Sequence, residues 1–186
     1  MNKERAIEQG EQSSRSVWLA HLNYELTAMA ELPTWAELLA RKVGRAAPSN
    51  ACVEATLLHA RLLIEFLTGR PNRQVGGRRR NSMDVGPGDF LPGWSLSAPE
   101  RFDDWLRLID SHLAHLSKRR ADIGVAPEGY LTQLVDDVIA AMAEFVSALK
   151  SSGAYDASIL QAALGQARVQ RMKGPSRWPL RSAASQ

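Results

Sequence analysis

The pattern of hydrophobic and polar positions predicts a chain built from amphipathic helices. Along most of its length, hydrophobic residues recur three and four positions apart, which is the spacing of one face of an α-helix. The clearest pattern lies between residues 101 and 122, and its hydrophobic stripe consists of Phe102, Leu106, Ile109, Leu113 and Leu116. No internal repeat and no pair of strand-like segments accompanies these helices. The sequence therefore predicts an all-α fold, a bundle of four to five main helices with one long glycine- and arginine-rich loop.

Two helices are predicted in the N-terminal quarter of the chain. The first begins at Val17 and ends at Pro33, because proline lacks a backbone donor and disfavours a helix interior. Thr34 and Glu37 then have the spacing of a capping box, which predicts the start of a second, shorter helix. The residues expected to face the core in these two helices are Trp18, Leu22, Leu26, Met29, Trp35, Leu38, Leu39 and Val43.

Residues 51–69 form the most hydrophobic of the predicted helices. Its polar stripe consists of Glu54, Arg61, Glu65 and Thr68. The remaining positions, which include Leu58 and Leu62, are expected to be covered on nearly all sides. This pattern places the helix at the centre of the bundle.

The C-terminal part of the chain predicts two more helices. One runs from about Leu131 to Leu149, and Asp156 can cap the last one, which ends at Gly174. The first 16 residues are polar and are expected to form a flexible leader that is partly helical. The predicted organisation is a leader over residues 1–16, a single helical-bundle domain over 17–173 and a basic tail over 174–186.

Residues 70–97 are predicted to form the long loop. Its first half, up to residue 88, is rich in glycine and contains the consecutive arginines Arg78, Arg79 and Arg80. A connection of this length inside a compact domain is usually functional or disordered. The second half is expected to be anchored on the bundle by its hydrophobic residues Phe90, Leu91 and Trp94.

The composition predicts a globular protein of the cytoplasm. Hydrophobic residues make up 45% of the chain and charged residues 23%, which is ordinary for such proteins. No hydrophobic run approaches the roughly 18 residues of a membrane span, and the N-terminus lacks the apolar core of a secretory signal. No membrane partner is therefore expected. The single cysteine, Cys52, excludes an internal disulfide and a multi-cysteine metal site.

The formal net charge of +3 hides an uneven distribution. Residues 70–80 and 166–186 together contain ten basic residues and no acidic one, so the rest of the chain has a net charge of −7. Basic segments of this kind bind phosphate backbones and other anionic partners, although arginine-rich loops without any partner are equally common. RNA or another anionic ligand is therefore one predicted partner.

Histidines supply the first candidate chemistry. His112 and His115 are three positions apart in segment 101–122, with Arg119 beside them, and two imidazoles at this spacing can contact one metal ion. His59 of the central helix would supply a third ligand. The alternative is that these histidines bond to nearby acidic or backbone groups, with His59 bonded to one neighbour in the core. Two-histidine spacing recurs by chance in many helices, so no metal is assigned. No phosphate-binding loop, dinucleotide-binding motif or nucleophile elbow is present, and no cofactor is assigned.

Arg107 and His112 supply the second candidate, because four residues separate them. This pattern on a late helix of a small all-α bundle resembles the motif of the HEPN superfamily, whose members are often dimeric and often metal-independent RNases of toxin–antitoxin and phage-defence systems. The resemblance implies a homodimer in which His112 is the general acid/base and Arg107 holds the phosphate. The two lie about 140° apart around the helix, so they need a partner chain or a distortion to converge. The alternative for Arg107 is a surface ion pair with Asp103 or Asp104.

A second resemblance concerns the fold more than the activity. Residues 57–66, 89–91 and 112–117 together look like a group of small uncharacterised bacterial helical proteins. In this interpretation the motifs gather around the polar residues His59, His112, His115 and Arg119. Two functions are therefore predicted. The first is a non-enzymatic helical module that binds a partner protein or an anionic ligand in a bacterial stress or defence context, and the second is a HEPN-like RNase. The binding residues of the first would be His59, His115, Arg119, Arg78, Arg79 and Arg80.

Overall fold

The computed structural model describes residues 3–43, 46–69, 85–113 and 130–173. The elements are α1 (Lys3–Val43), α2 (Ala46–Leu67), the short 3-10 helix η1 (Pro87–Asp89), α3 (Arg101–Leu113), α5 (Tyr130–Ser152) and α6 (Ser158–Lys173). These described residues contain no strand, which confirms the predicted all-α bundle of four to five helices. None of the described helices is both long enough and apolar enough to cross a membrane.

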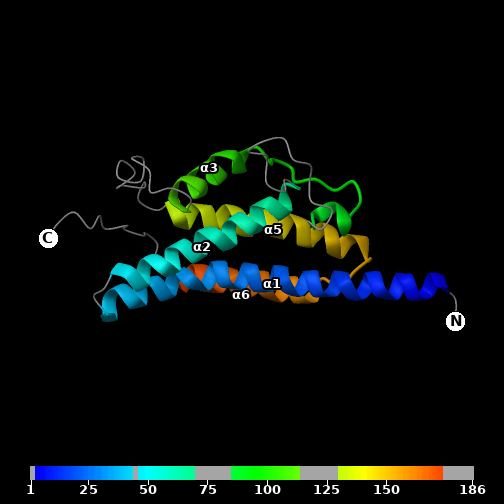
Figure 1. Ribbon diagram of the computed structural model, residues 1–186, viewed down its shortest axis with the longest axis horizontal. Helices are drawn as coiled ribbons and strands as arrows, with labels where there is room; N and C mark the ends of the chain where they lie inside the picture. Colours follow the sequence, from blue (N-terminus) through cyan, green and yellow to red (C-terminus); the bar gives the residue numbers. More distant parts are fainter. Residues whose placement is uncertain (1–2, 44–45, 70–84, 114–129, 174–186) are drawn as a thin grey trace.

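The helices are arranged in two layers (Figure 1). Helices α1 and α6 lie side by side in one layer, α2 and α5 form the second, and α3 packs on α2. Helices α1 and α6 run in the same direction, as two hydrogen bonds show. Arg15 of α1 donates to the Tyr155 hydroxyl just before α6 at 2.5 Å, and Gln166 of α6 donates to Glu31 farther along α1 at 2.9 Å.

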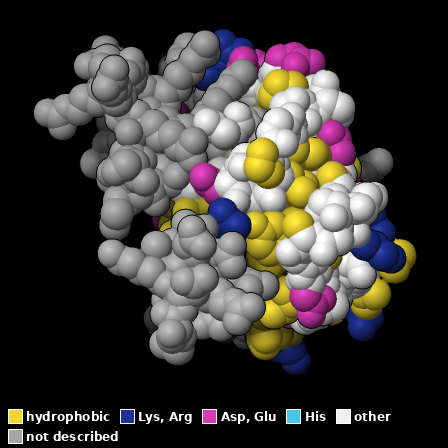
Figure 2. Space-filling view, turned by 90° about the vertical axis from the view of Figure 1, so that its right-hand side faces the viewer, with side chains coloured by type: hydrophobic (Ala, Val, Ile, Leu, Met, Phe, Trp, Pro, Cys, Tyr) yellow, Lys and Arg dark blue, Asp and Glu magenta, His cyan; other side chains and the backbone are white. Residues whose placement is uncertain are grey.

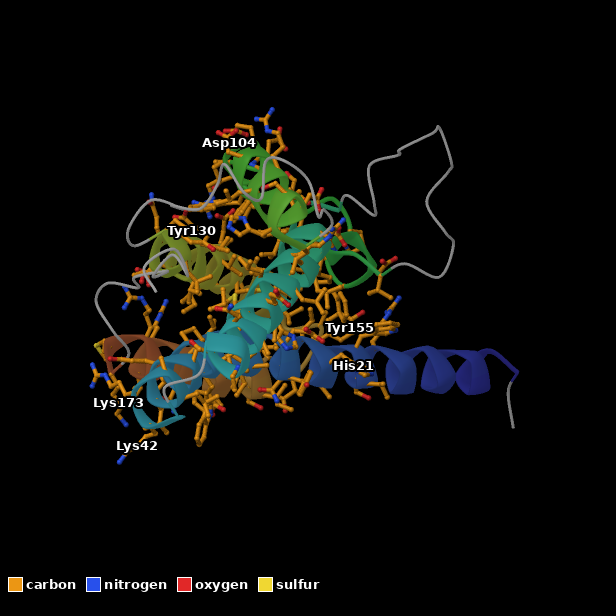
Figure 3. The ribbon with its side chains drawn as sticks, turned by 60° about the vertical axis from the view of Figure 1, so that its left-hand side comes forward. His21, Lys42, Asp104, Tyr130, Tyr155 and Lys173 are labelled. Atoms are coloured by element: carbon orange, nitrogen blue, oxygen red, sulfur yellow. The ribbon has the colours of Figure 1, made fainter. Side chains whose placement is uncertain are left out.

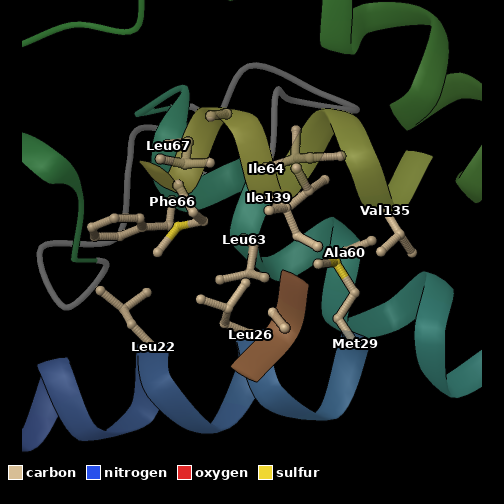
Figure 4. Packing of buried hydrophobic residues seen from close by; sticks show 14 of the residues in the cluster. Leu22, Leu26, Met29, Ala60, Leu63, Ile64, Phe66, Leu67, Val135 and Ile139 are labelled. Carbon is tan, nitrogen blue, oxygen red and sulfur yellow. The ribbon is translucent and has the colours of Figure 1, made fainter. Parts of the chain in front are cut away.

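The hydrophobic core lies between these two layers (Figure 4). Leu26 of α1 lies beside Leu63 of α2, and both side chains are completely buried. The completely buried Ile64 of α2 lies beside Ile139 of α5. Phe145 of α5 is buried in the same core. Each such side chain contributes about 1.5–3 kcal/mol relative to an exposed position. Burial of these faces therefore holds α1, α2 and α5 together.

The second half of the long loop is anchored on the bundle, as its hydrophobic residues predict. The buried Phe90 ring makes edge contacts with Phe66 of α2 and Phe145 of α5, at centroid distances of 6.0 and 6.1 Å. Trp94 also meets the Phe145 ring, at 5.3 Å. Edge-to-face contacts between aromatic rings are a favoured geometry. The first half of the loop, from residue 70 to 84, lies outside the described residues.

Helix α3 begins at Arg101, where the pattern predicts a helix, and residues 114–129 lie outside the described part of the chain. Phe102 and Ile109 are buried, as their place in the hydrophobic stripe predicts. Trp105 fixes α3 to α5, because its indole donates to Asp137 at 2.8 Å. An ion pair between Arg61 of α2 and Asp110 fixes α3 to α2.

The prediction that Pro33 ends the first helix is wrong. Helix α1 continues through Pro33, and the segment predicted as a leader is helical from Lys3 onward. Thr34 does not begin a second helix, and its hydroxyl is buried without a hydrogen-bond partner among the described residues. A proline inside a helix costs about 3 kcal/mol. Packing of α1 along both α2 and α6 outweighs this local cost.

Replacement of Pro33 by alanine is expected to raise the free energy of unfolding, by up to about 3 kcal/mol. Alanine restores the missing backbone donor inside α1 and removes the ring from the preceding turn. Urea unfolding followed by circular dichroism measures the change. Pro92→Ala is the matched control, because Pro92 lies exposed in a loop and its loss should leave stability unchanged or slightly lower. A Pro33→Ala protein less stable than wild type would contradict the continuous helix.

Several hydrophobic side chains that the pattern assigns to the core are exposed. They are Trp18, Trp35, Leu38, Leu58 and Leu62. Helical spacing shows which residues share a face, but it does not show how much of that face the neighbouring helices cover. The central helix α2 is therefore covered on fewer sides than its sequence predicts.

The prediction that Asp156 caps the last helix is confirmed. Its carboxylate accepts a hydrogen bond of 2.9 Å from the Ser158 amide at the start of α6. Hydrogen bonds from the hydroxyl and the amide of Ser158 lower the pKa of the Asp156 carboxyl. This cap therefore stabilises α6 above the carboxyl's unfolded pKa, and its contribution is lost as the pH falls through the lower folded pKa.

Candidate functional site

His59 faces α1. Its Nδ1 donates to the Glu25 carboxylate at 2.5 Å, and the Tyr24 ring lies edge-on to the imidazole at a centroid distance of 5.7 Å. Both side chains of the His59–Glu25 pair are mostly buried. The expectation that His59 bonds to one neighbour is confirmed. That neighbour is Glu25, and the hydrogen bond between the two side chains joins α2 to α1.

His112 lies in the last turn of α3, against the first residue of α5. Its Nδ1 donates to the Leu108 carbonyl at 3.0 Å, and its ring stacks on Tyr130 with centroids 5.6 Å apart. A carbonyl oxygen only accepts, so Nδ1 carries a proton and Nε2 is the acceptor of the neutral ring. The Tyr130 hydroxyl is buried without a hydrogen-bond partner among the described residues, and burial raises the pKa of Tyr130 to about 12.

Arg107 lies exposed on α3 and donates to Asp104 at 2.5 Å. This is the surface ion pair predicted as the alternative role of Arg107. Within the described residues, no hydrogen bond joins Arg107 to His112, which instead bonds to Leu108. The geometry expected of an RNase site is therefore not assembled by the described part of one chain.

The other predicted site residues lie outside the described part of the chain. They are His115, Arg119, Arg78, Arg79 and Arg80. Their binding roles stay predictions, as does a metal site that includes His115. Among the described residues, no three His, Cys, Asp or Glu side chains are grouped so that they could hold a metal ion. Cys52 is half-buried, and burial raises the pKa of its thiol.

A further candidate surface is one that the sequence pattern did not identify. It begins on α1, where hydrophobic and polar side chains recur at alternating intervals of three and four along one side. Tyr24 is 59% exposed and Trp35 is 54% exposed within this row. The α1 stripe consists of Val17, His21, Tyr24, Ala28, Glu31, Trp35, Leu38 and Lys42, of which only Ala28 and Glu31 are half-buried.

Helix α6 carries a second row with the same spacing beside the first. The α6 stripe consists of Ile159, Ala162, Gln166, Val169 and Lys173, all exposed. The hydrogen bond between Gln166 and Glu31 joins the two rows near their middle. Figure 3 shows Lys42 and Lys173 together at one end of this layer, and Tyr155 and His21 towards the other. The two stripes therefore form one surface, here called the α1/α6 face.

The two ends of the α1/α6 face differ in charge. Arg41 and Arg168 are also exposed near the end with Lys42 and Lys173, although neither belongs to the two stripes. The acidic residue at this end, Glu37, is paired with Arg41. The side of the molecule nearer the start of α1 exposes hydrophobic, acidic and basic side chains together (Figure 2). One end of the face is therefore basic, and the other, at Val17 and Ile159, has no Lys, Arg, Asp or Glu among the stripe residues.

The described residues thus offer two regions for function. One is the His112–Tyr130 contact between α3 and α5, and the other is the α1/α6 face. The first presents one candidate general base without its expected arginine, and the second presents an extended hydrophobic surface. The chain matches no protein-family model, no curated protein and no solved structure in comparisons with each of these.

Proposed function

We propose that the protein is a non-enzymatic helical module that binds a partner protein through the α1/α6 face. The observation that carries this proposal is the exposure of Tyr24 and Trp35 in one row with aliphatic side chains. Large contiguous hydrophobic patches are rare on monomeric proteins and usually mark interaction sites. Tyrosine and tryptophan are also the residues most enriched at the energetic centres of protein interfaces.

The distribution of polar groups on the face supports the same proposal. Protein interfaces commonly combine a hydrophobic centre with a charged rim. On the α1/α6 face, Lys42 and Lys173 lie at one edge, and the row between them and Val17 is largely apolar. The polar groups near its middle, Glu31 and Gln166, bond to each other. The interior of the face can therefore be covered without leaving these two groups unpaired.

Site-specific photo-crosslinking in the cells that produce the protein tests this proposal. A photoreactive phenylalanine analogue replaces Trp35 in one variant and Leu58 in a control variant. Leu58 is 48% exposed on α2, so both positions reach solvent to a similar extent. We expect protein adducts at position 35 in clear excess over position 58. Equal yields at the two positions, in folded variants, would contradict the proposal.

The HEPN-like RNase stays the alternative, and one observation favours it. The hydrogen bond to Leu108 leaves Nε2 of His112 as the basic nitrogen, as a general base requires. The ion pair of Arg107 with Asp104 gives it no further support. Metal-free cleavage of structured RNA that His112→Ala abolishes would establish this activity. The binding module predicts that wild type and His112→Ala behave alike in that assay.

A further inference from the structure

We infer that the partner of the α1/α6 face is a second copy of this chain, packed antiparallel about a two-fold axis. The inference rests on the proposed function, since it names the protein that this face binds. In a two-fold dimer, the same surface serves both chains, so it must be complementary to itself. The α1/α6 face meets this condition in its spacing, its charge and its size.

The spacing of the α1 stripe reads the same in both directions. Intervals of four and three alternate along it and are symmetric about a point between Ala28 and Glu31. An antiparallel copy centred there places Tyr24 against Trp35 of the second copy, and Trp35 against its Tyr24. Beside the axis, Ala28 is level with Glu31 of the second copy, so the small Ala28 side chain leaves room for Glu31 where the two helices approach most closely. The two largest exposed rings of the stripe thus cover each other.

The charges of α6 are complementary in the same arrangement. Glu31 and Gln166 are bonded, so they lie at the same level of the parallel helices α1 and α6. A two-fold axis that passes between Ala28 and Glu31 of α1 then places Lys173 of one copy level with Asp156 of the other. Lys173 is the last residue of α6 and Asp156 lies two residues before its start, and both are exposed. Opposite charges therefore meet at both ends of the dimer.

The size of the face approaches that of a stable interface. From Val17 to Leu38 it is about 32 Å long at the rise of an α-helix. Two helices at their usual spacing give it a width of about 18 Å. Helix α6 has 16 residues and accompanies α1 over only about 24 Å, so the flat area is about 500 Å², and protruding side chains add to it. Stable complexes bury about 800 Å² on each partner.

The molar mass of the purified chain in solution tests whether a second copy binds. Light scattering at micromolar concentrations should give twice the monomer mass of 20.5 kDa. Trp35→Glu and Tyr24→Glu should each weaken self-association by at least about 30-fold, as expected for central aromatic residues of an interface. Leu58→Glu, the matched charge on α2, should leave the dimer intact. A monomeric wild type would overturn the inference, as would folded Trp35→Glu and Tyr24→Glu proteins that both remain dimers.

A short thiol-to-thiol cross-linker tests the antiparallel arrangement. In a Cys52→Ser background, Ala28→Cys should cross-link to itself across the axis. Leu38→Cys should not, because the two copies of that residue would lie about 25 Å apart along the helices. Cross-linking at both positions indicates parallel helices and overturns the arrangement. Absence of cross-linking at position 28, in a protein that is dimeric by mass, overturns it equally.

Failure of this inference is distinguishable from failure of the proposed function. A wild-type chain that is monomeric by mass, but forms adducts with a different protein at position 35 in cells, retains the proposed function and loses the second copy as its partner. A chain that is monomeric and forms no excess adducts at position 35 loses both.

Discussion

Replacement of Phe145 by alanine is expected to lower the free energy of unfolding by about 3–5 kcal/mol. Phe145 is completely buried in α5 and makes edge contacts with Phe66, Phe90 and Trp94. Its loss would leave a cavity where α2, α5 and the anchored loop meet. Small domains are stable by only about 5–15 kcal/mol, so this variant should unfold at a much lower urea concentration.

Leu58→Ala is the control for Phe145→Ala, and it also tests the observed exposure of α2. Leu58 belongs to the hydrophobic part of the helix, so the sequence pattern alone assigns it a large effect. Its side chain is exposed, however, and we expect a loss below about 1 kcal/mol. Urea unfolding of both variants measures the difference. Comparable losses at the two positions would show that Leu58 is covered by a neighbouring element.

A double-mutant cycle between His59 and Glu25 is expected to give a coupling energy of about 1–3 kcal/mol. Both side chains are mostly buried, and the hydrogen bond between them joins α2 to α1. His59→Ala alone leaves the Glu25 carboxylate without its donor in a poorly hydrated position. Replacement of both residues removes that penalty, so the double variant should be more stable than the two single losses predict.

The pair Arg107 and Asp104 is the matched control for this cycle. Both side chains are largely exposed on α3, and surface ion pairs contribute little because water and salt screen them. We expect a coupling energy close to zero for this pair. Absence of coupling in the His59–Glu25 cycle as well would contradict a bond between these side chains across the α1/α2 interface.

The sequence predicted most of the helices correctly, because a helix depends on the spacing of its hydrophobic residues and on capping residues close to its ends. The start of α3, the cap at Asp156 and the anchoring of Phe90 and Trp94 are of this kind. The continuity of α1 is different. Pro33 signals a helix end within its own neighbourhood, whereas the contacts that keep α1 helical come from α2 and α6. Such tertiary contacts outweigh local propensity.

The α1/α6 face was missed because α1 has two hydrophobic sides. Leu22, Leu26 and Met29 lie on the buried side, and Tyr24 and Trp35 lie on the exposed one. Spacing alone does not show which side the other helices cover. The helix end predicted at Pro33 separates Tyr24 from Trp35, so the exposed stripe that contains both residues is visible only when α1 is treated as one continuous helix.

Local sequence patterns also do not predict the partners of the polar site residues, because these partners lie on other helices. Glu25, which holds His59, is 34 positions away in the sequence. Tyr130, which stacks on His112, lies on a different helix. Only the pairing of Arg107 with an acid one turn away was open to prediction, and Asp104 makes it.

The most direct test of the central claim is the yield of in-cell adducts at position 35 relative to position 58. If the α1/α6 face binds a protein, position 35 gives adducts in clear excess and mass spectrometry identifies the partner, which we expect to be a second copy of this chain. If the two positions give the same yield in folded variants, the exposed tryptophan contacts no protein, and the face is not the functional surface.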